Sequence, residues 1–245
     1  MRQTPELGTL LALGPSPCLR EVQDVLAPVL SGWDPRLATH VLGGLAKARR
    51  GTTSWNVLEA MQLQQLETNV FHFGAAMSAM STWQQALALL DRAKECDAAN
   101  IVVVNSAINR CAKGGAWLVA IKLLHGTDCT PDVISYSGAI SACSLGSQWH
   151  LAVHLLMEMS SARIQQDAIS YNSAISACEA GDQWNLSLEL LRSMKENVLR
   201  PTVITYNSVL AACHNWQLAL QLLLTMQKEM MEADVISYSA VISNA

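Results

Sequence analysis

One short pattern recurs along the chain at nearly constant spacing, and this repetition limits the folds that the chain can adopt. The segment DVISYSGAISAC begins at Asp132, and related segments begin at Asn100, Asp167, Thr202 and Asp234. Successive copies are 32, 35, 35 and 32 residues apart. A fixed period of this length is typical of solenoid proteins, in which each repeat is a small unit that packs against its neighbours. The sequence therefore predicts a repeat architecture.

The pattern divides the chain into six units and the start of a seventh, with position 1 placed directly after each polar boundary residue. The units comprise residues 35–69, 70–100, 101–132, 133–167, 168–202, 203–234 and 235–245. The first unit is the most divergent, and the last stops after eleven residues, which favours a fragment or one part of a longer protein. Whether residues 1–34 fold as a capping helix stays open, although the segment REVQDVLAPVL could do so.

Each unit is predicted to form two helices joined by a turn. The opening VISYS has the propensity of a strand, but Tyr136, Ile140 and Cys143 follow the spacing of one helical face. Gly146 interrupts the pattern, and the segment WHLAVHLLMEM then forms a second apolar stripe. The predicted fold class is therefore all-α: an α-solenoid of helix-turn-helix repeats wound into a right-handed superhelix.

Some units are shorter than 35 residues, and their missing residues are expected to lie in loops. Two residues separate Cys213 from Trp216, whereas five separate Cys178 from Trp184. The unit from residue 203 is therefore expected to have lost residues in the link between its two segments, and the unit from residue 101 near HGTDCTPD. Loops tolerate deletions better than packed elements do.

The recurring cysteines, tryptophans and methionines are interpreted as packing residues. Position 11 holds cysteine in the regular units and Leu45 or Met80 in the weaker ones, which indicates an apolar site. Neighbouring helices lie about 8–10 Å apart, too far for disulfides, whose Cα atoms lie within roughly 7 Å of each other. The residues are Cys111, Cys143, Cys178, Cys213, Trp83, Trp117, Trp149, Trp184, Trp216, Met61, Met159, Met194 and Met226.

Catalytic and metal-binding patterns are weak or missing in the sequence. His150, His154 and Glu158 have a helical spacing that can bind zinc, but a histidine pair without a third ligand close by is weak evidence. No glycine-rich phosphate loop, nucleophile elbow or HExxH segment occurs. Apolar runs also fall short of the roughly 18 residues that a membrane-spanning helix needs. We expect no enzyme activity, cofactor, metal or membrane association.

The unit VISYSGAISACSLGSQWHLAVHLLMEMSSARIQQD resembles the pentatricopeptide repeat. The resemblance rests on the V-[IV]-[ST]-Y-[NS] opening, the helix pair and the polar or PD close at position 35. It covers about residues 35–245, is strongest from residue 101, and in YNSAISACEAGDQW is most similar to algal and dinoflagellate members. The tetratricopeptide repeat is a near neighbour, but its Trp-Leu-Gly-Tyr pattern is missing.

The resemblance implies single-stranded RNA binding with one base per repeat. In this family the residue at position 5 and the last residue of the repeat contact the base edge, and an aliphatic residue at position 2 flanks the base. The pairs implied here are Asn105 with Asp132, Ser137 with Asp167, Asn172 with Thr202, and Asn207 with Asp234; the flanking residues are Val102, Ile134, Ile169 and Ile204. The family's base preferences give an expected core of 5′-U-G-(C/U)-U-3′.

The first two units carry less regular residues at these positions. Thr39 with Asn69 would favour adenine, but Arg36 occupies position 2 of that unit. Gly74 with Asn100 indicates no particular base. The resemblance therefore implies a sequence-selective core that starts at residue 101.

Charge leaves alternatives to RNA binding open. The family often places lysine at position 13 for contacts with phosphate, and Lys47 and Lys113 match. From residue 101 onward, however, the chain contains 8 Lys or Arg residues and 11 Asp or Glu residues. This acidic balance favours a scaffold that binds a peptide or helix, whereas the regular Asn/Ser–Asp pairs favour RNA. A third interpretation is the RNA-targeting part of a longer enzyme.

The partners implied by the resemblance are single-stranded RNA and, in a larger complex, other proteins, but not DNA or a membrane. The implied location is the chloroplast or the mitochondrion. The amino-terminal segment MRQTPELGTLLALGPSPCLREV resembles neither a good signal peptide nor a convincing transit peptide. The compartment is therefore implied by the resemblance alone.

Overall fold

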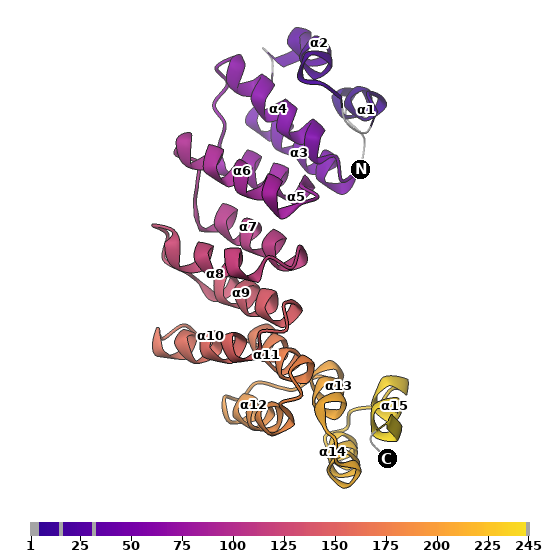
Figure 1. Cartoon of the computed structure of the whole chain (residues 1–245). Coiled ribbons are helices and arrows are strands. Elements are labelled where there is room, and N and C mark those ends of the chain that lie inside the picture. Colours follow the sequence, from indigo (N-terminus) through magenta and orange to yellow (C-terminus); the bar gives the residue numbers. More distant parts are fainter. Residues whose placement is uncertain (1–4, 15–16, 31–32, 244–245) are drawn as a thin grey trace. The chain divides into compact units, whose positions relative to one another are not determined.

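The computed structural model describes residues 5–14, 17–30 and 33–243, and within these ranges the regular elements are fifteen α-helices (Figure 1). Two helices precede the repeats: α1 (Pro5–Ala12) and α2 (Leu19–Leu30). We call the first helix of a repeat its A helix and the second its B helix. The A helices are α3 (Pro35–Lys47), α5 (Val70–Ala79), α7 (Ile101–Lys113), α9 (Val133–Leu145), α11 (Ala168–Ala180), α13 (Val203–Ala212) and α15 (Val235–Ser243). The B helices are α4 (Gly51–Leu63), α6 (Trp83–Glu95), α8 (Trp117–Gly126), α10 (Trp149–Ser161), α12 (Trp184–Glu196) and α14 (Trp216–Lys228).

The chain divides into two compact units, each of which is described by itself. The N-terminal unit comprises residues 1–114 and 127–130, and the C-terminal unit comprises residues 115–126 and 131–245. The A helix α7 therefore belongs to the N-terminal unit, and the B helix α8 belongs to the C-terminal unit.

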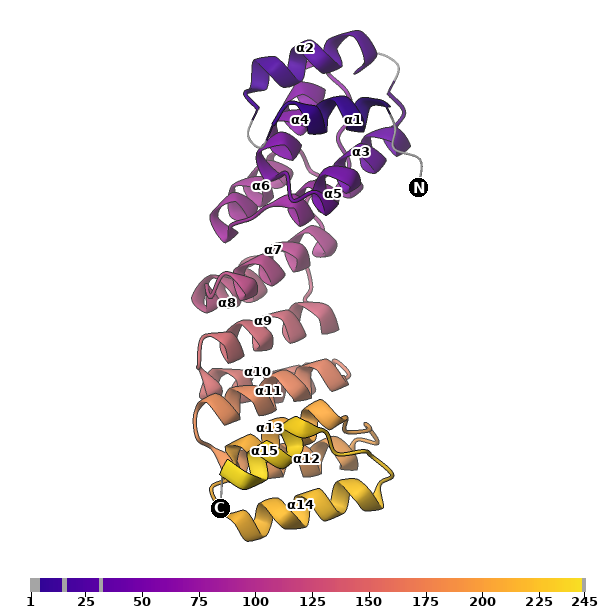
Figure 2. The same ribbon diagram turned by 90° about the vertical axis from the view of Figure 1, so that its right-hand side faces the viewer.

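In the C-terminal unit the helices form two layers. The A helices follow one another side by side, α9 against α11, α11 against α13 and α13 against α15 (Figure 2). Each of α10, α12 and α14 packs against the A helix of its own repeat and against the A helix of the next one. The all-α solenoid with helix-turn-helix repeats is confirmed, while the handedness of the superhelix stays a prediction.

The N-terminal unit has the same neighbour relations and two additional helices. Helix α5 packs against α3 and α7, and the B helices α4 and α6 pack against α5 and α7. Helix α1 packs against α3 and α2 packs against α4, through buried side chains that include Leu10, Val22 and Leu26. The segment REVQDVLAPVL thus lies in an amphipathic helix against the first repeat.

The segments with strand propensity are helical because their first turns are capped. In α9 the Asp132 carboxylate accepts a hydrogen bond from the Ser135 amide at 2.8 Å, and the Ser135 hydroxyl accepts one from the Asp132 amide at 3.1 Å. This reciprocal capping box satisfies donors that a helix start leaves without partners. The predicted apolar face of Tyr136, Ile140 and Cys143 is then buried, which confirms the helical interpretation of VISYS.

Three of the tryptophans at the start of a B helix pack on the C-cap glycine that follows the next A helix, whereas Trp216 is 48% exposed. A Cβ atom built on Gly181 would lie 2.2 Å from Cδ1 of Trp149, and one built on Gly146 would lie 2.4 Å from Cδ1 of Trp117. Both glycines have negative φ angles, so close approach rather than backbone conformation requires glycine there. Gly114 and Trp83 repeat the contact in the N-terminal unit, which confirms the packing role of these tryptophans.

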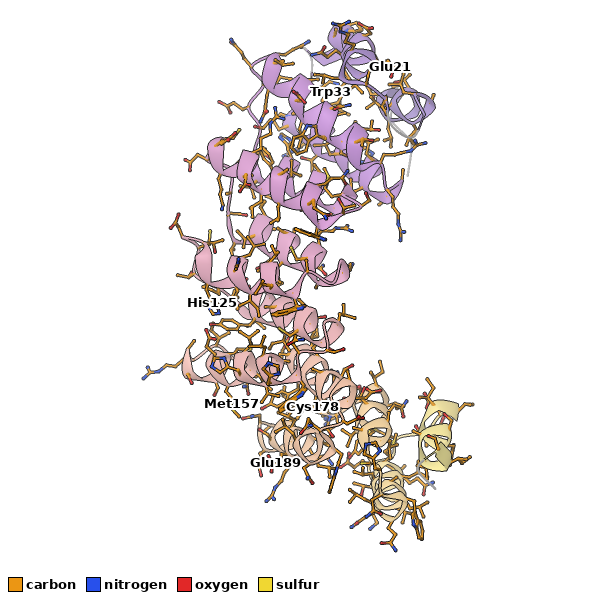
Figure 3. The ribbon with its side chains drawn as sticks, viewed as in Figure 1. Glu21, Trp33, His125, Met157, Cys178 and Glu189 are labelled. Atoms are coloured by element: carbon orange, nitrogen blue, oxygen red, sulfur yellow. The ribbon has the colours of Figure 1, made fainter. Side chains whose placement is uncertain are left out.

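The cysteines at position 11 lie in the core of the repeats. Cys111, Cys143, Cys178 and Cys213 are all fully buried, and Cys178 can be followed in Figure 3. Burial raises the pKa of the thiols of Cys111, Cys143 and Cys178 to about 11, because an apolar surrounding disfavours the thiolate. The packing interpretation is confirmed for these cysteines and for the buried methionines Met61, Met159, Met194 and Met226.

The expectation that the short repeats lost loop residues is wrong. Helix α13 has 10 residues where α9 and α11 have 13, and the link that follows it, residues 213–215, is as long as residues 146–148. Helix α8 likewise has 10 residues where α10 has 13. Three residues are close to one helical turn, so the deletion removes the last turn while the remaining turns keep their buried face and the link keeps its length.

Candidate functional site

Position 2 of every A helix from α5 onward carries a solvent-exposed apolar side chain. In the C-terminal unit Ile134, Ile169 and Ile204 are 63%, 63% and 70% exposed. On α7 of the N-terminal unit, Val102 is 56% exposed. Single exposed apolar residues are common on protein surfaces, but a β-branched aliphatic at the same position of successive packed helices forms a regular apolar row. The four predicted base-flanking residues therefore lie where a ligand could contact them.

The last residue of each repeat is the N-cap of the following A helix. Asp167 Oδ1 accepts the Ser170 amide at 2.8 Å, and Asp234 Oδ1 accepts the Ser237 amide at 2.9 Å. Thr202 and Asp132 cap α13 and α9 in the same way. These side chains thus have a structural role that explains their recurrence without a ligand. Their place at a helix start also brings them beside position 2 of that helix.

Asn207 and Asp234 form the one predicted pair for which a direct hydrogen bond is described. Asn207 Nδ2 donates to Asp234 Oδ1 at 3.1 Å, and Asn207 Oδ1 accepts from the Ser237 hydroxyl at 2.6 Å. Asn207 is 9% exposed and Asp234 is exposed. The Ser237 amide, followed by the Asn207 amide and the Ser237 hydroxyl, lowers the pKa of the Asp234 carboxyl below its ordinary value. The pair is therefore held in one geometry with a charged carboxylate at the surface.

Asn172 and Thr202 are brought together through a third residue. The Thr205 hydroxyl donates to Asn172 Oδ1 at 2.6 Å and lies 3.1 Å from the Thr202 hydroxyl. Asn172 Oδ1 is therefore occupied, whereas its amide N–H groups have no partner within the described ranges. The arrangement presents hydrogen-bond donors at the predicted base-contacting position.

Ser137 and Asp167 make no hydrogen bond to each other among the interactions described. The Ser137 hydroxyl donates to the Val133 carbonyl of its own helix at 2.7 Å. Asp167 uses Oδ1 to cap α11, and its Oδ2 has no partner in the part of the chain that is described. This repeat therefore offers a carboxylate oxygen without a competing amide beside it.

Asn105 belongs to the N-terminal unit and Asp132 to the C-terminal unit, so the surroundings of each residue are described within its own unit. Asn105 lies on α7 and is 8% exposed. Asp132 is partly exposed and caps α9.

The Ser or Thr at position 3 was not among the predicted site residues. Ser135, Ser170, Thr205 and Ser237 are buried, and each closes a capping box with the preceding repeat's last residue. Thr205 and Ser237 also donate to the position 5 asparagine of the preceding repeat. The signal was present in the sequence, because Asp or Thr three residues before Ser or Thr at a helix start is a capping pattern.

The A helices carry almost no acidic charge. Across the seven A helices the basic residues are Arg36, Lys47, Arg110 and Lys113, and the acidic one is Glu179. The B helices contain equal numbers of acidic and basic residues, so the acidic excess of the chain lies in the links and in the segment before the repeats. Lys47 and Lys113, the predicted phosphate contacts, are exposed in the last turns of α3 and α7.

The candidate zinc residues take part in other interactions. Glu158 accepts a hydrogen bond from the Tyr136 hydroxyl at 3.0 Å, and its carboxylate lies 3.6 Å from Nδ1 of His125 and 3.9 Å from Nδ1 of His154. The His150 ring packs edge-on against Trp149. Among the described residues, no group of three or more His, Cys, Asp or Glu side chains is arranged to hold a metal ion. No described helix is long and apolar enough to cross a bilayer.

Comparison with known proteins identifies the repeat. Residues 154–216 match the family model of the pentatricopeptide repeat domain. The crystal structure of the pentatricopeptide repeat protein PPR10 from maize matches with a TM-score of 0.74 at 19% identity, over 98% of this chain and 36% of that one. Residues 154–216 therefore belong to the pentatricopeptide repeat family, and the chain has the helical-repeat fold of PPR10. No curated protein matches its sequence.

Two further pentatricopeptide repeat structures are similar. The structure of PPR10 in complex with an 18-nt psaJ RNA element matches with a TM-score of 0.54 at 19% identity, over 96% of this chain and 40% of that one. The pentatricopeptide repeat domain of Arabidopsis thaliana protein-only RNase P 1, in complex with tRNA, matches with a TM-score of 0.59 at 14% identity, over 76% of this chain and 97% of that one. At these identities the similarity shows the fold.

Proposed function

We propose that this protein binds single-stranded RNA in a sequence-selective manner, with one base per repeat and no catalytic step. The observation that carries the proposal is the row of exposed aliphatic side chains at position 2, each beside a polar N-cap residue. An unstacked base needs an apolar surface for its ring and hydrogen-bonding groups for its edge. The RNA complexes of PPR10 and of the Arabidopsis domain support the same ligand class.

Asn207 and Asp234 suit uracil, whose edge has one N–H donor between two carbonyl acceptors. Asn207 uses one amide hydrogen for Asp234 and keeps a second, for which the described residues offer no partner. That hydrogen would donate to a uracil carbonyl, while Asp234 would accept the N3–H. Asn105 with Asp132 carries the same residue types, and we assign it uracil as well.

Ser137 and Asp167 suit guanine, whose N1 and N2 groups form two adjacent N–H donors. The uncommitted Oδ2 of Asp167 accepts from such a pair, and the small Ser137 leaves room for the larger purine. Asn172 with Thr202 lacks a carboxylate and presents amide donors. Because cytosine and uracil share the O2 acceptor, this repeat accepts either pyrimidine. The proposed core is 5′-U-G-(C/U)-U-3′, with the amino-terminal repeat at the 5′ side.

Lys47 and Lys113 would contribute contacts with phosphate in this proposal. Phosphate contacts supply most of the affinity of a nucleic-acid complex and make it salt-dependent. The seven A helices together have a net positive formal charge even though the whole chain is at −4, and this positive charge lies on α3 and α7. As the family resemblance implies, we place the natural RNA among chloroplast or mitochondrial transcripts, where binding would affect processing, stability or translation.

Binding to a labelled RNA of about 12 nucleotides that contains UGUU, at about 50 and 200 mM salt, tests the proposal. The matched control RNA has those four bases changed. We expect selective binding that weakens at the higher salt concentration. Salt-insensitive capture of a peptide or helix, with no RNA binding by folded helical protein, would favour the scaffold instead.

Asn207→Ser tests the base assignment within the same assay. The substitution removes the amide donor and leaves Asp234 with a small neighbour, as in the Ser137–Asp167 repeat. We expect the preferred fourth base to change from uracil to guanine, with a change of about 10- to 100-fold in the affinity ratio, since a base contact discriminates by about 1–3 kcal/mol. An unchanged ratio, with an unchanged circular dichroism spectrum, would contradict the assignment.

A further inference from the structure

The second repeat presents an aromatic ring at the position where later repeats present an aliphatic side chain. Phe71, at position 2 of α5, is 73% exposed. The same position of the neighbouring α7 holds Val102, which is 56% exposed. An exposed phenylalanine ring gains nothing from the core, but its faces are suited to stacking with a nucleobase, which contributes more than an aliphatic contact.

Polar groups that could select a base are missing or occupied beside Phe71. Position 5 of this repeat is Gly74, and a Cβ atom built there would meet nothing within 4 Å. The last residue, Asn100, uses Oδ1 to accept the amides of Val102 and Val103 as the cap of α7. The repeat therefore offers a ring and open space, with only the Asn100 amide to donate a hydrogen bond.

The adjacent His72 does not compete with Phe71 for a ligand. Its ring is buried, with Nε2 at 3.0 Å from the Pro35 carbonyl and Nδ1 accepting the Asn69 amide at 3.2 Å. The first contact connects α5 to the start of α3, and the second belongs to the capping box of α5 itself, so the first turn of α5 is held at both ring nitrogens of His72. Phe71 consequently projects from a rigid element, and little ordering entropy is lost when a base stacks on it.

The surrounding A helices are basic. The helices α3, α5 and α7 contain Arg36, Lys47, Arg110 and Lys113 and no Asp or Glu. Arg36 lies at position 2 of α3, is exposed, and has no partner among the described residues. Since α3 packs against α5, a chain of nucleotides that stacks on Phe71 passes next to a helix that contains two basic residues and no acidic one.

We propose that α3 and α5 form an anchor for the two nucleotides on the 5′ side of the 5′-U-G-(C/U)-U-3′ core. This anchor would bind those nucleotides whatever their bases. In this inference, which rests on the proposed function for the RNA and its direction, Phe71 stacks on the nucleotide directly 5′ of the core. Arg36 binds the phosphate of the nucleotide before it. Any base has a face that can stack, so the anchor adds affinity without adding sequence preference.

The test uses the full chain and RNAs of the form A-X-U-G-U-U, in which X is A, C, G, U or an abasic site. We expect the four bases to give affinities within about 2-fold of one another, and the abasic RNA to bind about 10-fold more weakly. Phe71→Ala should cost about 10-fold for every base at X and leave the abasic RNA unchanged. Phe71→Trp should keep the affinity, which separates stacking from a structural role of the position.

Arg36→Ala tests the charge contribution, with Lys94→Ala on the B helix α6 as the matched control. The Arg36 variant should reduce the slope of log affinity against log salt by about 0.7, the value for one phosphate contact on a single strand, and leave base preference unchanged. The control should leave the slope unchanged. Both variants change exposed residues, and unaltered melting temperatures would verify their folds.

The outcomes separate the anchor from the base-contacting repeats. If UGUU selectivity persists but Phe71→Ala has no effect, or weakens the abasic RNA equally, the anchor is overturned and the proposed function stands. If the protein binds RNA without selectivity and still loses affinity through Phe71→Ala, the anchor stands without the assigned core. If folded protein binds none of the RNAs, both are overturned.

Discussion

The two units of the protein share one helical framework and differ in the surface that the A helices present. In the N-terminal unit, α3, α5 and α7 contain four Lys or Arg residues and no carboxylate; in the C-terminal unit, α9, α11, α13 and α15 contain Glu179 and no Lys or Arg. The whole N-terminal unit contains 10 Lys or Arg residues and 10 Asp or Glu residues. The whole C-terminal unit contains 6 Lys or Arg residues and 10 Asp or Glu residues. In the proposed function, this difference in charge would place more of the phosphate contacts in the N-terminal unit and more of the base contacts in the C-terminal unit.

The difference follows from which positions the fold leaves free to vary. The buried faces are the same in both units, because position 11 and the tryptophan–glycine contact serve packing between repeats. Positions 2, 5 and 13 face solvent or a polar cluster, so they can change without loss of the core. In protein–nucleic acid complexes, phosphate contacts position the ligand and base contacts select it. Under the proposed function, most basic residues of the A helices lie in the N-terminal unit and most of the proposed base-contacting residues lie in the C-terminal unit.

Thiol modification should give the largest contrast between the units. Cys18 and Cys96 of the N-terminal unit are exposed, whereas Cys143, Cys178 and Cys213 of the C-terminal unit are buried. Reaction with a maleimide at pH 8, followed by mass spectrometry, should modify the exposed pair more than about 10³-fold faster, because the buried thiols react only after the unit opens. Equal rates in native protein would contradict the buried core of the C-terminal repeats. Complete modification in urea is the control.

The same buried thiols predict a loss of stability at alkaline pH. Burial raises the pKa of Cys143 and Cys178 from 9.0 to about 11. Since the unfolded chain releases these protons near pH 9 and the folded chain keeps them to about pH 11, the contribution of the two thiols to the free energy of unfolding should be constant below pH 9 and be lost between pH 9 and 11. Replacement of both cysteines with alanine should reduce this part of the pH dependence.

The tryptophan–glycine contact is shared by the units, and a substitution can test how much it contributes. Gly181→Ala places a Cβ atom 2.2 Å from the Trp149 ring and should destabilise the protein by about 1–3 kcal/mol in urea unfolding. Gly43→Ala in α3 is the matched control, because nothing lies within 4 Å of its Cβ and it should be neutral or stabilising by up to about 1 kcal/mol. Adding Trp149→Leu to Gly181→Ala should recover part of the loss, and additive costs would disprove the contact.

Transfer of a positive charge between the units tests the division of affinity and specificity. Ala180, exposed at position 13 of α11, corresponds to Lys113 of α7. Ala180→Lys should strengthen RNA binding several-fold at low salt, steepen the salt slope by about 0.7 and leave the base preference unchanged. Met157→Lys, on the exposed face of the B helix α10, adds the same charge and should leave the slope unchanged. A changed base preference for Ala180→Lys would show that the two tasks are coupled.

Much of the framework could be predicted from the sequence because each repeat gives an independent copy of the same signal. The helix pairs and the burial of position 11 follow from apolar spacing, and capping outweighs the strand propensity of VISYS. The missing residues of the short repeats were assigned to loops because spacing between Cys213 and Trp216 does not distinguish a lost turn from a lost link. Whether a turn or a link is lost depends on the residue at which the helical backbone hydrogen bonds of α13 end.

The candidate site could be predicted less completely, since the partners of a polar side chain depend on distances of a few tenths of an ångström. Asn207 bonds Asp234, whereas Ser137 bonds its own helix, although both occupy position 5. The apolar residues at position 2 could be predicted from the alignment of the repeats alone. Phe71 occupies that position too, and its aromatic character is visible in the sequence once position 2 is aligned across the units.

The smallest expected effect compares one backbone position in the two units. Gln65 and Val198 both occupy position 31, and both have positive φ angles, 57° and 60°. A β-branched residue is more strained in this left-handed conformation than an unbranched one. Val198 is 89% exposed, so its side chain contributes little packing that could offset the strain. Val198→Asn should therefore stabilise the protein by about 0.5–1 kcal/mol, and Gln65→Asn by less.

Urea unfolding of the two variants measures this difference, and it also bears on the comparison between the units. If each unit unfolds in its own transition, the Val198 variant should shift only the transition of the C-terminal unit. One transition that shifts as a whole would show that the units unfold cooperatively. Equal stabilisation by both substitutions would mean that the β-branch adds no strain at position 31, and that the left-handed turn itself, shared by the two units, sets the cost.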